Sequence, residues 1–532
     1  MRAGTKLLFV VLIISLMTAV AAAQCPDRIP PGTVIPDTLS LSSTSGTLRA
    51  ELKMRHSVDF GGYTHYCYNY ATDQGDIESP TLRLNPGDQL VLDLKNRIQT
   101  DESDTMTGMS GMDMSGAPGT TCGDTGNVTI SSTNVHFHGM NIPPVCHQDN
   151  VITTLIQPGS KGFRYSFKVP ANQPPGLYWY HPHIHGFTEF QVNGGATGAL
   201  VVEGMDKLRP EVKGLTERIF LLRQQFLVPW IPGPYQLSIN YEVADFPNFP
   251  SPVINMKPNE KQFWRVANTT NQDFTPLQFW FNGVPQKMLL IALDGYPLAQ
   301  PRMETTILVP PAGRAEFIVQ APPNDGTQAS FVTLDYDTGI AGNPDLEKIL
   351  GNVRLTTDND SKVASKPSEN AQPKPIEQLK FAGLQNAKVT KTRKLFFSEK
   401  FGGTGGPIEF YLTLDGHKPK IFEPNEKPVI TTHVGAVEDW TIENRALETH
   451  AFHMHQIHFL LLEVDGKPVK PVDLRDTIEV PFWEGSGHPF HSVKVRMDFR
   501  DPTTAGTFVF HCHILLHEDL GMMHKILVKR QD

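Results

Sequence analysis

Short apolar stretches separated by turn residues dominate this chain. Residues 89–96 (QLVLDLKN), 261–268 (KQFWRVAN) and 507–510 (TFVF) are rich in the β-branched and aromatic side chains that favour strands. Long amphipathic helical repeats are scarce, whereas Gly and Pro number 43 each. This pattern predicts an all-β protein made of sandwiches joined by many turns.

One strand pattern recurs three times along the chain. Residues 89–96 and 437–444 (VEDWTIEN) each precede a cluster of histidines, whereas residues 261–268 precede none. A second pattern links residues 176–183 (GLYWYHPH) with residues 506–513 (GTFVFHCH). These internal repeats indicate three related β-sandwiches, of which the middle one is a spacer without metal ligands.

Length and composition suggest where these three units begin and end. A chain of 532 residues is too long for one hydrophobic core and suits about three domains. Residues 358–375 have the Pro-, Lys-, Ser- and Asn-rich composition of a linker. We therefore expect a first unit over 24–205 with a methionine-rich insert at 101–126, a second unit over 206–357, and a third unit over 376–532.

The first 23 residues have the pattern of a secretory signal peptide. Arg2 and Lys6 precede an apolar run over residues 7–20, and three alanines at 21–23 offer a cleavage site. We therefore expect a secreted or periplasmic protein, and no other segment has the pattern of a membrane span. The net charge of −9, without a basic tract, argues against nucleic-acid binding.

The five cysteines fit an oxidising compartment. If Cys512 binds a metal, Cys25, Cys67, Cys122 and Cys146 remain, which is enough for two disulfides in any of three pairings. Cys122 and Cys146 bracket one strand and its loop, which favours that pair, although the sequence leaves the three pairings open.

The candidate chemistry lies in four clusters of histidines. His511 and His513 flank Cys512 at the end of a predicted strand, so the thiol should point to one face and the two imidazoles to the other. A thiolate, an imidazole and a thioether, here Cys512, His517 and Met522, are the ligands of a blue-copper site. The other clusters contain His136 with His138, His181 with His183 and His185, and His450 with His453 and His455.

On these motifs the sequence resembles the three-domain multicopper oxidases, the laccase-like group with cupredoxin domains. All four copper motifs stand in the family's order, at residues 136–139 (HFHG), 181–183 (HPH), 450–455 (HAFHMH) and 511–522. The middle unit matches more weakly, through residues 310–319 (PPAGRAEFIV). The resemblance implies three Greek-key β-sandwiches of the cupredoxin type, and the ending of the chain looks like bacterial members.

The resemblance also implies four copper ions in two sites. The type 1 copper would be bound by His450, Cys512 and His517, with Met522 as the axial ligand. The type 2 copper would be bound by His136 and His453. The type 3 pair would be bound by His138, His181, His183, His455, His511 and His513. We further expect the three-copper cluster between the first and third units, and an exposed edge on His450 where electrons enter.

The implied activity couples one-electron oxidation of phenol-type substrates to four-electron reduction of dioxygen to water. Electrons would pass from Cys512 to His511 and His513. Water formation needs four protons, so a carboxylate near the cluster is expected. Glu518 and Asp149 match acidic positions of the family, although Asp149 lies in a segment, residues 145–150 (VCHQDN), that departs from the usual Asp-Gly pattern.

The methionine-rich insert supports a second interpretation. Thioethers prefer Cu(I), and the insert contains Met106, Met109, Met112 and Met114. These residues could bind cuprous ion and supply it to the type 1 site of a cuprous oxidase or metallo-oxidase that confers copper tolerance. The insert could equally be a flexible loop in which methionine has no role. A non-catalytic exported copper-binding protein is disfavoured, since it would not need the complete ligand set.

Overall fold

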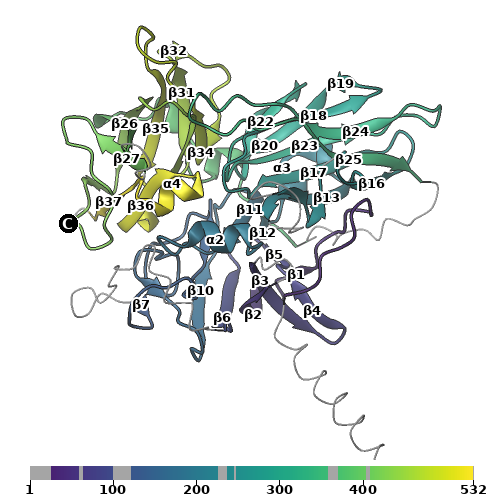
Figure 1. Ribbon diagram of the computed structural model, residues 1–532, viewed down its shortest axis with the longest axis horizontal. Coiled ribbons are helices and arrows are strands. Elements are labelled where there is room, and N and C mark those ends of the chain that lie inside the picture. Colours follow the sequence, from purple (N-terminus) through teal and green to yellow (C-terminus); the bar gives the residue numbers. More distant parts are fainter. Residues whose placement is uncertain are drawn as a thin grey trace, which may run out of the picture.

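A computed structural model describes residues 25–58, 64–99, 122–225, 236–244, 247–356, 370–402 and 408–530. The expected signal peptide, the four insert methionines (Met106, Met109, Met112 and Met114) and most of the expected linker lie outside these residues. Strands are the main regular structure of the described chain, and they form three pairs of packed sheets that confirm the all-β fold (Figure 1). Each pair encloses its own hydrophobic core.

The first pair of sheets lies at the bottom of Figure 1 and contains two of the histidine clusters. One sheet has the order β1 (Ser40–Ser42), β5 (Thr81–Leu84), β12 (Gly198–Val202), β11 (Gly176–His181) and β8 (His136–His138). The other has the order β10 (Phe163–Lys168), β6 (Gln89–Asn96), β2 (Thr47–Val58), β3 (Thr64–Thr72) and β4 (Gly75–Glu78). The smaller elements are β7 (Cys122–Gly123), β9 (Thr154–Leu155), α2 (Thr188–Asn193), α3 (Met205–Leu208) and the 3-10 turn at Pro210–Val212.

The second pair of sheets, teal in Figure 1, comes from the middle of the chain. Its larger sheet has the order β15 (Glu242–Val243), β14 (Gln236–Ile239), β13 (Thr216–Gln225), β17 (Lys261–Asn268), β23 (Arg314–Gln320), β20 (Met288–Leu293) and β21 (Tyr296–Glu304). Its smaller sheet has the order β16 (Val253–Met256), β25 (Lys348–Leu355), β24 (Ala329–Thr333), β18 (Thr275–Phe281) and β19 (Val284–Gln286), with β22 (Ile307–Val309) also paired to β18.

The third pair of sheets completes the chain and lies beside the first (Figure 1). One sheet has the order β27 (Ile408–Leu414), β26 (Lys391–Phe401), β29 (Ala436–Asn444), β35 (His491–Phe499), β31 (Phe459–Val464) and β32 (Lys467–Pro468), with β33 (Leu474–Arg475) paired to β31. The other has the order β28 (Ile430–His433), β37 (Met523–Lys529), β36 (Gly506–Cys512), β30 (His450–Met454) and β34 (Thr477–Val480). The helical elements are α4 (Leu515–Asp519) and the 3-10 turns at Ile376–Gln378, Leu384–Asn386 and Pro502–Thr504.

The repeated strands β6, β17 and β29 occupy equivalent positions in the three units. Each has one parallel and one antiparallel neighbour in its sheet. Each also ends in an asparagine, Asn96, Asn268 or Asn444, whose amide donates to two backbone carbonyls and accepts from the backbone N–H two residues later. The repeat seen in the sequence is therefore also a repeat of hydrogen bonding.

Buried charges join the first unit to the middle unit. Arg83 of β5 pairs with Glu203 at 2.8 Å and with Glu217 of β13, and Arg265 of β17 pairs with Glu217 and Glu316. Such pairs contribute little net stability because burial removes their hydration, but removing one partner leaves a costly unpaired charge. The network therefore fixes how the two units meet.

The two disulfides join Cys25 to Cys67 and Cys122 to Cys146, and Cys512 is free and buried. The favoured pair, Cys122 with Cys146, is thus confirmed.

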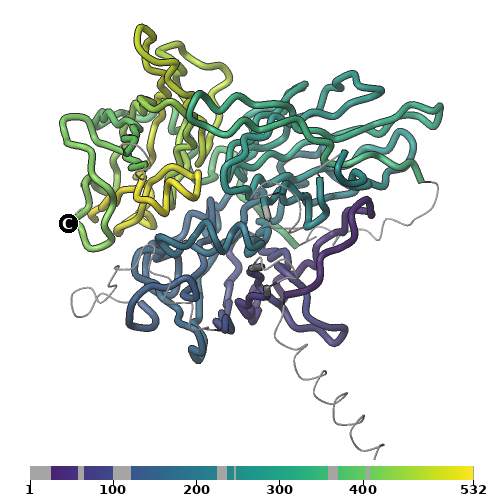
Figure 2. The backbone as a smooth tube through the Cα atoms, viewed as in Figure 1, coloured from purple at the N-terminus to yellow at the C-terminus, as the bar shows by residue number. Residues whose placement is uncertain are grey.

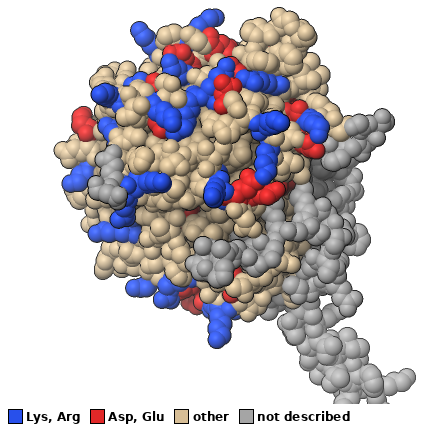
Figure 3. All heavy atoms as spheres, turned by 90° about the vertical axis from the view of Figure 1, so that its left-hand side faces the viewer, with Lys and Arg blue, Asp and Glu red and all other residues tan. Residues whose placement is uncertain are grey.

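The purple N-terminal stretch in Figure 2 runs from the first unit onto the teal middle unit, where Val34 bridges to Val253. Among the described residues, no helix is long and apolar enough to cross a membrane. The described part of the face in Figure 3 carries interspersed basic and acidic side chains.

Candidate metal centres

Two groups of buried metal-binding side chains meet at the end of β36. Cys512 groups with His450 and His517, whereas the adjacent His511 groups with His183 and His455, and the donor atoms of each group lie within 4.8 Å of one another. The thiol and the imidazole therefore point to opposite sides of the chain, as the strand pattern predicted. The strand ends at Cys512, so His513 follows it rather than continuing it.

Strand pairing assembles the larger group of histidines. His181 of β11 lies opposite His136 of β8, and His511 of β36 lies opposite His453 of β30. Across the first and third units, the ring of His136 stacks on that of His455 at 3.9 Å between centroids. The eight buried imidazoles of this histidine cluster are His136, His138, His181, His183, His453, His455, His511 and His513.

The histidine cluster has the properties of an imidazole metal site. Buried Nε2 atoms without a hydrogen-bond partner belong to His136, His138, His181, His453 and His513. Buried polar atoms normally find partners, because leaving them unpaired is costly. Burial and neighbouring imidazoles also lower the pKa of the ring of His138, which keeps it in the neutral form that binds metals. The donor set therefore fits copper, which imidazole ligands suit.

The smaller group combines the ligand types of a blue-copper site. The Sγ atom of Cys512 lies 3.5 Å from Nδ1 of His450 and 3.8 Å from Nδ1 of His517. The backbone N–H of Met522 donates to the carbonyl of His517 at 2.8 Å, and the carbonyl of Met522 accepts from the N–H of Cys512 at 3.1 Å. These bonds hold the buried thioether residue next to the thiol and the imidazole.

The expected exposed edge on His450 is absent. Its side chain is fully buried, because the ring of Phe397 packs on it at 4.8 Å and Glu399 lies 3.3 Å from its Nε2. Glu448 similarly covers His517, with 2.9 Å between Oε1 and Nε2. Glu448 is 14% exposed, so two carboxylates separate these imidazoles from solvent.

This carboxylate pair was not among the residues predicted from the sequence. Glu448 begins the third histidine cluster and could have been noticed there, whereas Glu399 comes from β26 and belongs to no motif. Burial, with Glu448 beside it, raises the pKa of Glu399 to about 9. Burial acts in the same direction on Glu448, but the charge of His517 prevails and lowers the pKa of Glu448 to about 2.

Both predicted catalytic carboxylates contact the histidine cluster, in different ways. Asp149 accepts from Nδ1 of His136 at 3.0 Å and from the amide of Gln456 at 2.5 Å. Glu518 lies 3.4 Å from Nε2 of His183 and 3.1 Å from Nδ1 of His511. Asp149 is thus arranged to orient an imidazole, as metal ligands commonly require.

Glu518 is arranged to hold a proton. It is fully buried, and neither of its carboxyl oxygens has a hydrogen-bond partner that meets geometric criteria. Burial, followed by the charge of Asp519, raises its pKa well above the ordinary value. Asp519 accepts from the backbone N–H groups of Gly186, Thr188 and Glu189, which ties α4 to the start of α2.

Two further histidines lie beside the cluster. His185 packs against Phe422 with 5.1 Å between ring centroids and lines a pocket with His183. His458 donates from Nε2 to the carbonyl of Asp294 in the middle unit at 2.7 Å. Neither belongs to a group of converging donor atoms among the described residues.

Three family models described as multicopper oxidase match residues 124–207, 223–346 and 401–532. Multicopper oxidase mco of Staphylococcus haemolyticus is 25% identical over 85% of this chain and 83% of its own length. The iron transport multicopper oxidase FET3 of Gibberella zeae is 29% identical over 75% of this chain and 67% of its own length. A laccase of Bacillus subtilis is 22% identical over 68% of this chain and 72% of its own length.

Solved structures show the same fold. A multicopper oxidase from Campylobacter jejuni, described as a metallo-oxidase, superposes with a TM-score of 0.65 at 22% identity, covering 95% of this chain and 97% of its own. McoA from Aquifex aeolicus gives a TM-score of 0.65 at 19% identity, covering 95% and 99%. The three sandwiches and their buried donor groups thus define a copper-dependent oxidoreductase with cupredoxin-type domains. The chain belongs to the multicopper oxidases.

Replacing Glu518 by Gln should slow proton delivery to reduced oxygen, because the amide keeps the shape of the side chain but cannot supply an acidic proton. We expect reoxidation of the fully reduced, copper-loaded protein by dioxygen to slow by about 100-fold or more. Anaerobic bleaching of the blue absorption by a reductant should keep its rate. Stopped-flow absorption measures both steps, and a wild-type reoxidation rate would remove Glu518 from the proton path.

Proposed function

We propose that the protein is a laccase-like multicopper oxidase that couples one-electron oxidation of phenol-type reductants to reduction of dioxygen to water. The single observation that carries this proposal is the position of Cys512 and His511. Adjacent residues of one chain belong to two separate buried donor groups, one with a thiol and one made of imidazoles. A protein that only stores metal has no need of this direct link.

The ligand roles follow the motif order. We assign His450, Cys512, His517 and Met522 to a type 1 copper, and His136 and His453 to a type 2 copper. The type 3 pair is assigned to His138, His181, His183, His455, His511 and His513, which makes four copper ions. When bound, copper supplies one-electron transfer at the thiolate site and dioxygen reduction at the histidine cluster.

The chain itself orients the link between the two sites. Nδ1 of His511 donates to the carbonyl of Cys512 at 2.9 Å. This bond fixes the tautomer of the imidazole and leaves its Nε2 directed at His455 and His183, at 3.1 and 3.5 Å. Residue 512 thus connects to the histidine cluster both through the chain and through a hydrogen bond. Glu518 lies beside the same ring, and we propose that it supplies protons for dioxygen reduction at the cluster.

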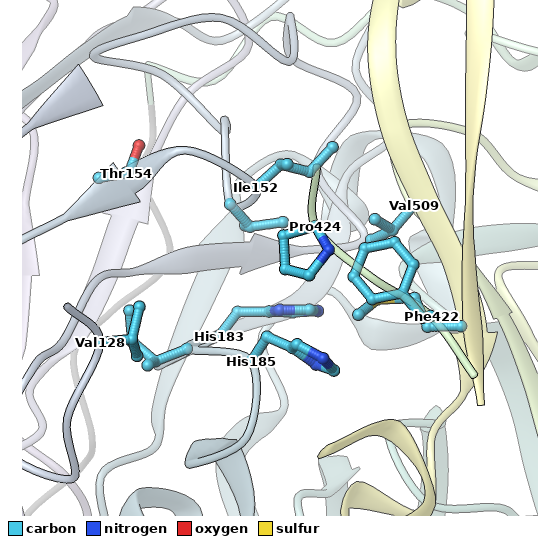
Figure 4. A pocket seen from close by; sticks show the side chains of 11 residues that line it. Val128, Ile152, Thr154, His183, His185, Phe422, Pro424 and Val509 are labelled. Atoms are coloured by element: carbon cyan, nitrogen blue, oxygen red, sulfur yellow. The ribbon is translucent and has the colours of Figure 1, made fainter. Parts of the chain in front are cut away.

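A pocket beside His183 suits dioxygen, the proposed second substrate. Figure 4 shows His183 and His185 on one side and the apolar side chains of Ile152, Phe422 and Val509 on the other. Small apolar molecules enter dry apolar cavities of this kind. The pocket therefore offers an approach to a buried imidazole that excludes charged reductants.

Enlarging Ile152 to Trp should obstruct this pocket. We expect the KM for dioxygen to rise several-fold. The KM for a phenol should stay unchanged, because electrons from the phenol enter at the group that contains Cys512. Oxygen-electrode kinetics at saturating phenol measure the first value. Ile340→Trp, at a position that is 74% exposed, is the control. An unchanged KM for dioxygen in Ile152→Trp would place the route elsewhere.

The carboxylate pair favours a second candidate function, oxidation of a metal cation such as Cu(I). Oε1 of Glu399 and Nε2 of His450 are buried and lack hydrogen-bond partners that meet geometric criteria. The atoms of Glu399, Glu448 and His450 converge within 4.8 Å, so the group could receive a cation next to a type 1 ligand. The insert methionines, Met106 to Met114, would then supply cuprous ion.

Two variants distinguish these candidates. For a cuprous oxidase, Glu399→Gln should raise the KM for Cu(I) about tenfold, or about 1.4 kcal/mol, and deleting residues 106–114 should cut Cu(I) oxidation steeply. Phenol oxidation should persist in both variants, measured as oxygen uptake under the same conditions. For a phenol oxidase, both activities should change little and together, and that result would remove the metallo-oxidase candidate.

We further propose that the protein is exported to the periplasm or the medium. The predicted signal peptide at residues 1–23 supports this, as do the two disulfides, which persist in oxidising compartments.

A further inference from the structure

We propose that Arg314, in the middle unit, is a positioning residue for the histidine cluster and, by holding Asp476, sets the orientation of His453. The inference rests on the proposed function, because it assigns that imidazole to copper. It replaces the expectation that the middle unit is only a spacer. Arg314 belongs to residues 310–319, the segment through which the middle unit resembles multicopper oxidases.

Arg314 reaches both ligand-bearing units from the start of β23. Its Nη1 and Nη2 atoms each donate to a different oxygen of Asp476 in the third unit, at 2.6 Å. Nη1 also lies 3.3 Å from Nδ1 of His138 in the first unit. Nη2 donates to the carbonyl of Asp294 in the middle unit at 2.8 Å, and the guanidinium is fully buried.

Asp476 continues the chain of contacts to a second ligand. Nδ1 of His453 donates to the backbone carbonyl of Asp476 at 2.8 Å and lies 3.1 Å from the hydroxyl of Thr477. The carboxylate of Asp294 accepts from the backbone N–H groups of Arg314 and Asp476, at 2.8 and 3.2 Å. The Arg314–Asp476 pair is therefore fixed from both sides and supports the imidazole of His453.

Gly139 independently indicates that the close approach of the Arg314 guanidinium to the first unit is important. It follows His138 in the first copper motif and has a φ of +81°, which favours glycine. A Cβ at this position would lie 2.3 Å from Nη2 of Arg314 and 2.8 Å from Oδ2 of Asp476. Because glycine has no side chain, this position leaves room for the guanidinium of Arg314, which comes from the middle unit. The glycine of the motif and the arginine of the middle unit form one arrangement.

The geometry requires arginine rather than any cation. A planar guanidinium can donate to both oxygens of Asp476 and still reach His138 and Asp294, whereas a lysine ammonium is a single point of charge. A buried ion pair contributes little net stability when compared with apolar packing. Its role here is therefore to hold Asp476 in place, whose backbone carbonyl accepts from Nδ1 of His453 as partners behind metal ligands do.

The test compares Arg314→Lys and Arg314→Met with Arg265→Met in the copper-loaded protein. Arg265 is a matched control, because it is a buried, doubly paired arginine on the adjacent strand that contacts no predicted ligand. In both Arg314 variants the hyperfine splitting of the type 2 EPR signal should change. Copper of the cluster should be removed by a chelator about tenfold more readily. The blue absorption should be unchanged.

In Arg265→Met, thermal unfolding should shift while the type 2 signal keeps its wild-type parameters. A wild-type EPR signal and copper retention in Arg314→Lys and Arg314→Met would overturn the inference. So would an equal change in Arg265→Met, because the effect would then be general loosening of the fold. Wild-type protein without a type 2 signal would instead overturn the proposed function itself.

Gly139→Ala tests the same geometry with every ligand and the arginine present. The added methyl group should displace the guanidinium and change the type 2 signal in the way that Arg314→Met does. In an Arg314→Met background, Gly139→Ala should change the signal by less than the sum of the two single variants, because its clash with the guanidinium is then already removed. Additive changes in the double variant would contradict the proposed role of Arg314.

Discussion

Successive residues near the end of a β-strand point to opposite sides, and the site described here depends on that constraint. β36 directs Cys512 toward His450 and His517, and His511 toward His183 and His455. Two donor groups with different chemistry are thereby joined by one peptide unit. Everything else in the site completes these groups or holds them in place. β8, β11 and β30 bring His136, His138, His181 and His453, His513 directly follows β36, and α4 brings His517 and Glu518.

Burying so many imidazoles is unfavourable unless something compensates for it. Eight rings converge with unpaired nitrogen atoms among them, and burial lowers the pKa of the rings of His138 and His453, which keeps these two neutral. Bound copper would satisfy those atoms. The surrounding polar groups lie in positions that suit distinct roles: Asp149 contacts His136, Glu518 lies beside His511, and the proposed support of His453 comes from the Arg314–Asp476 pair. The middle unit has none of the assigned ligands, yet it supplies part of this support.

The sequence predicts the strands and the histidine motifs that converge in the structure, because both signals are local. A repeated strand pattern identified β6, β17 and β29, and residue types at fixed spacing identified the four histidine motifs. Contacts between segments far apart in the chain left no such signal. The role of Glu399 was therefore not predicted, and neither was the contact of Arg314 with His138, 176 positions away. The prediction of an exposed edge on His450 was wrong for the same reason, since Phe397 and Glu399 cover that ring from β26. The favoured disulfide, between Cys122 and Cys146, was predicted correctly because these cysteines are close in the sequence.

The central claim is that Cys512 and the histidine cluster form two linked copper sites. The most direct measurement is the copper content of the loaded protein together with its absorption and EPR spectra, for the wild type and for Cys512→Ser. The account predicts about four copper ions per wild-type chain, with an intense blue band and a separate type 2 signal. Cys512→Ser should lose the blue band and oxygen uptake while it keeps the type 2 signal. A Cys512→Ser variant that stays blue, or a wild-type protein that binds a single copper, would contradict the account.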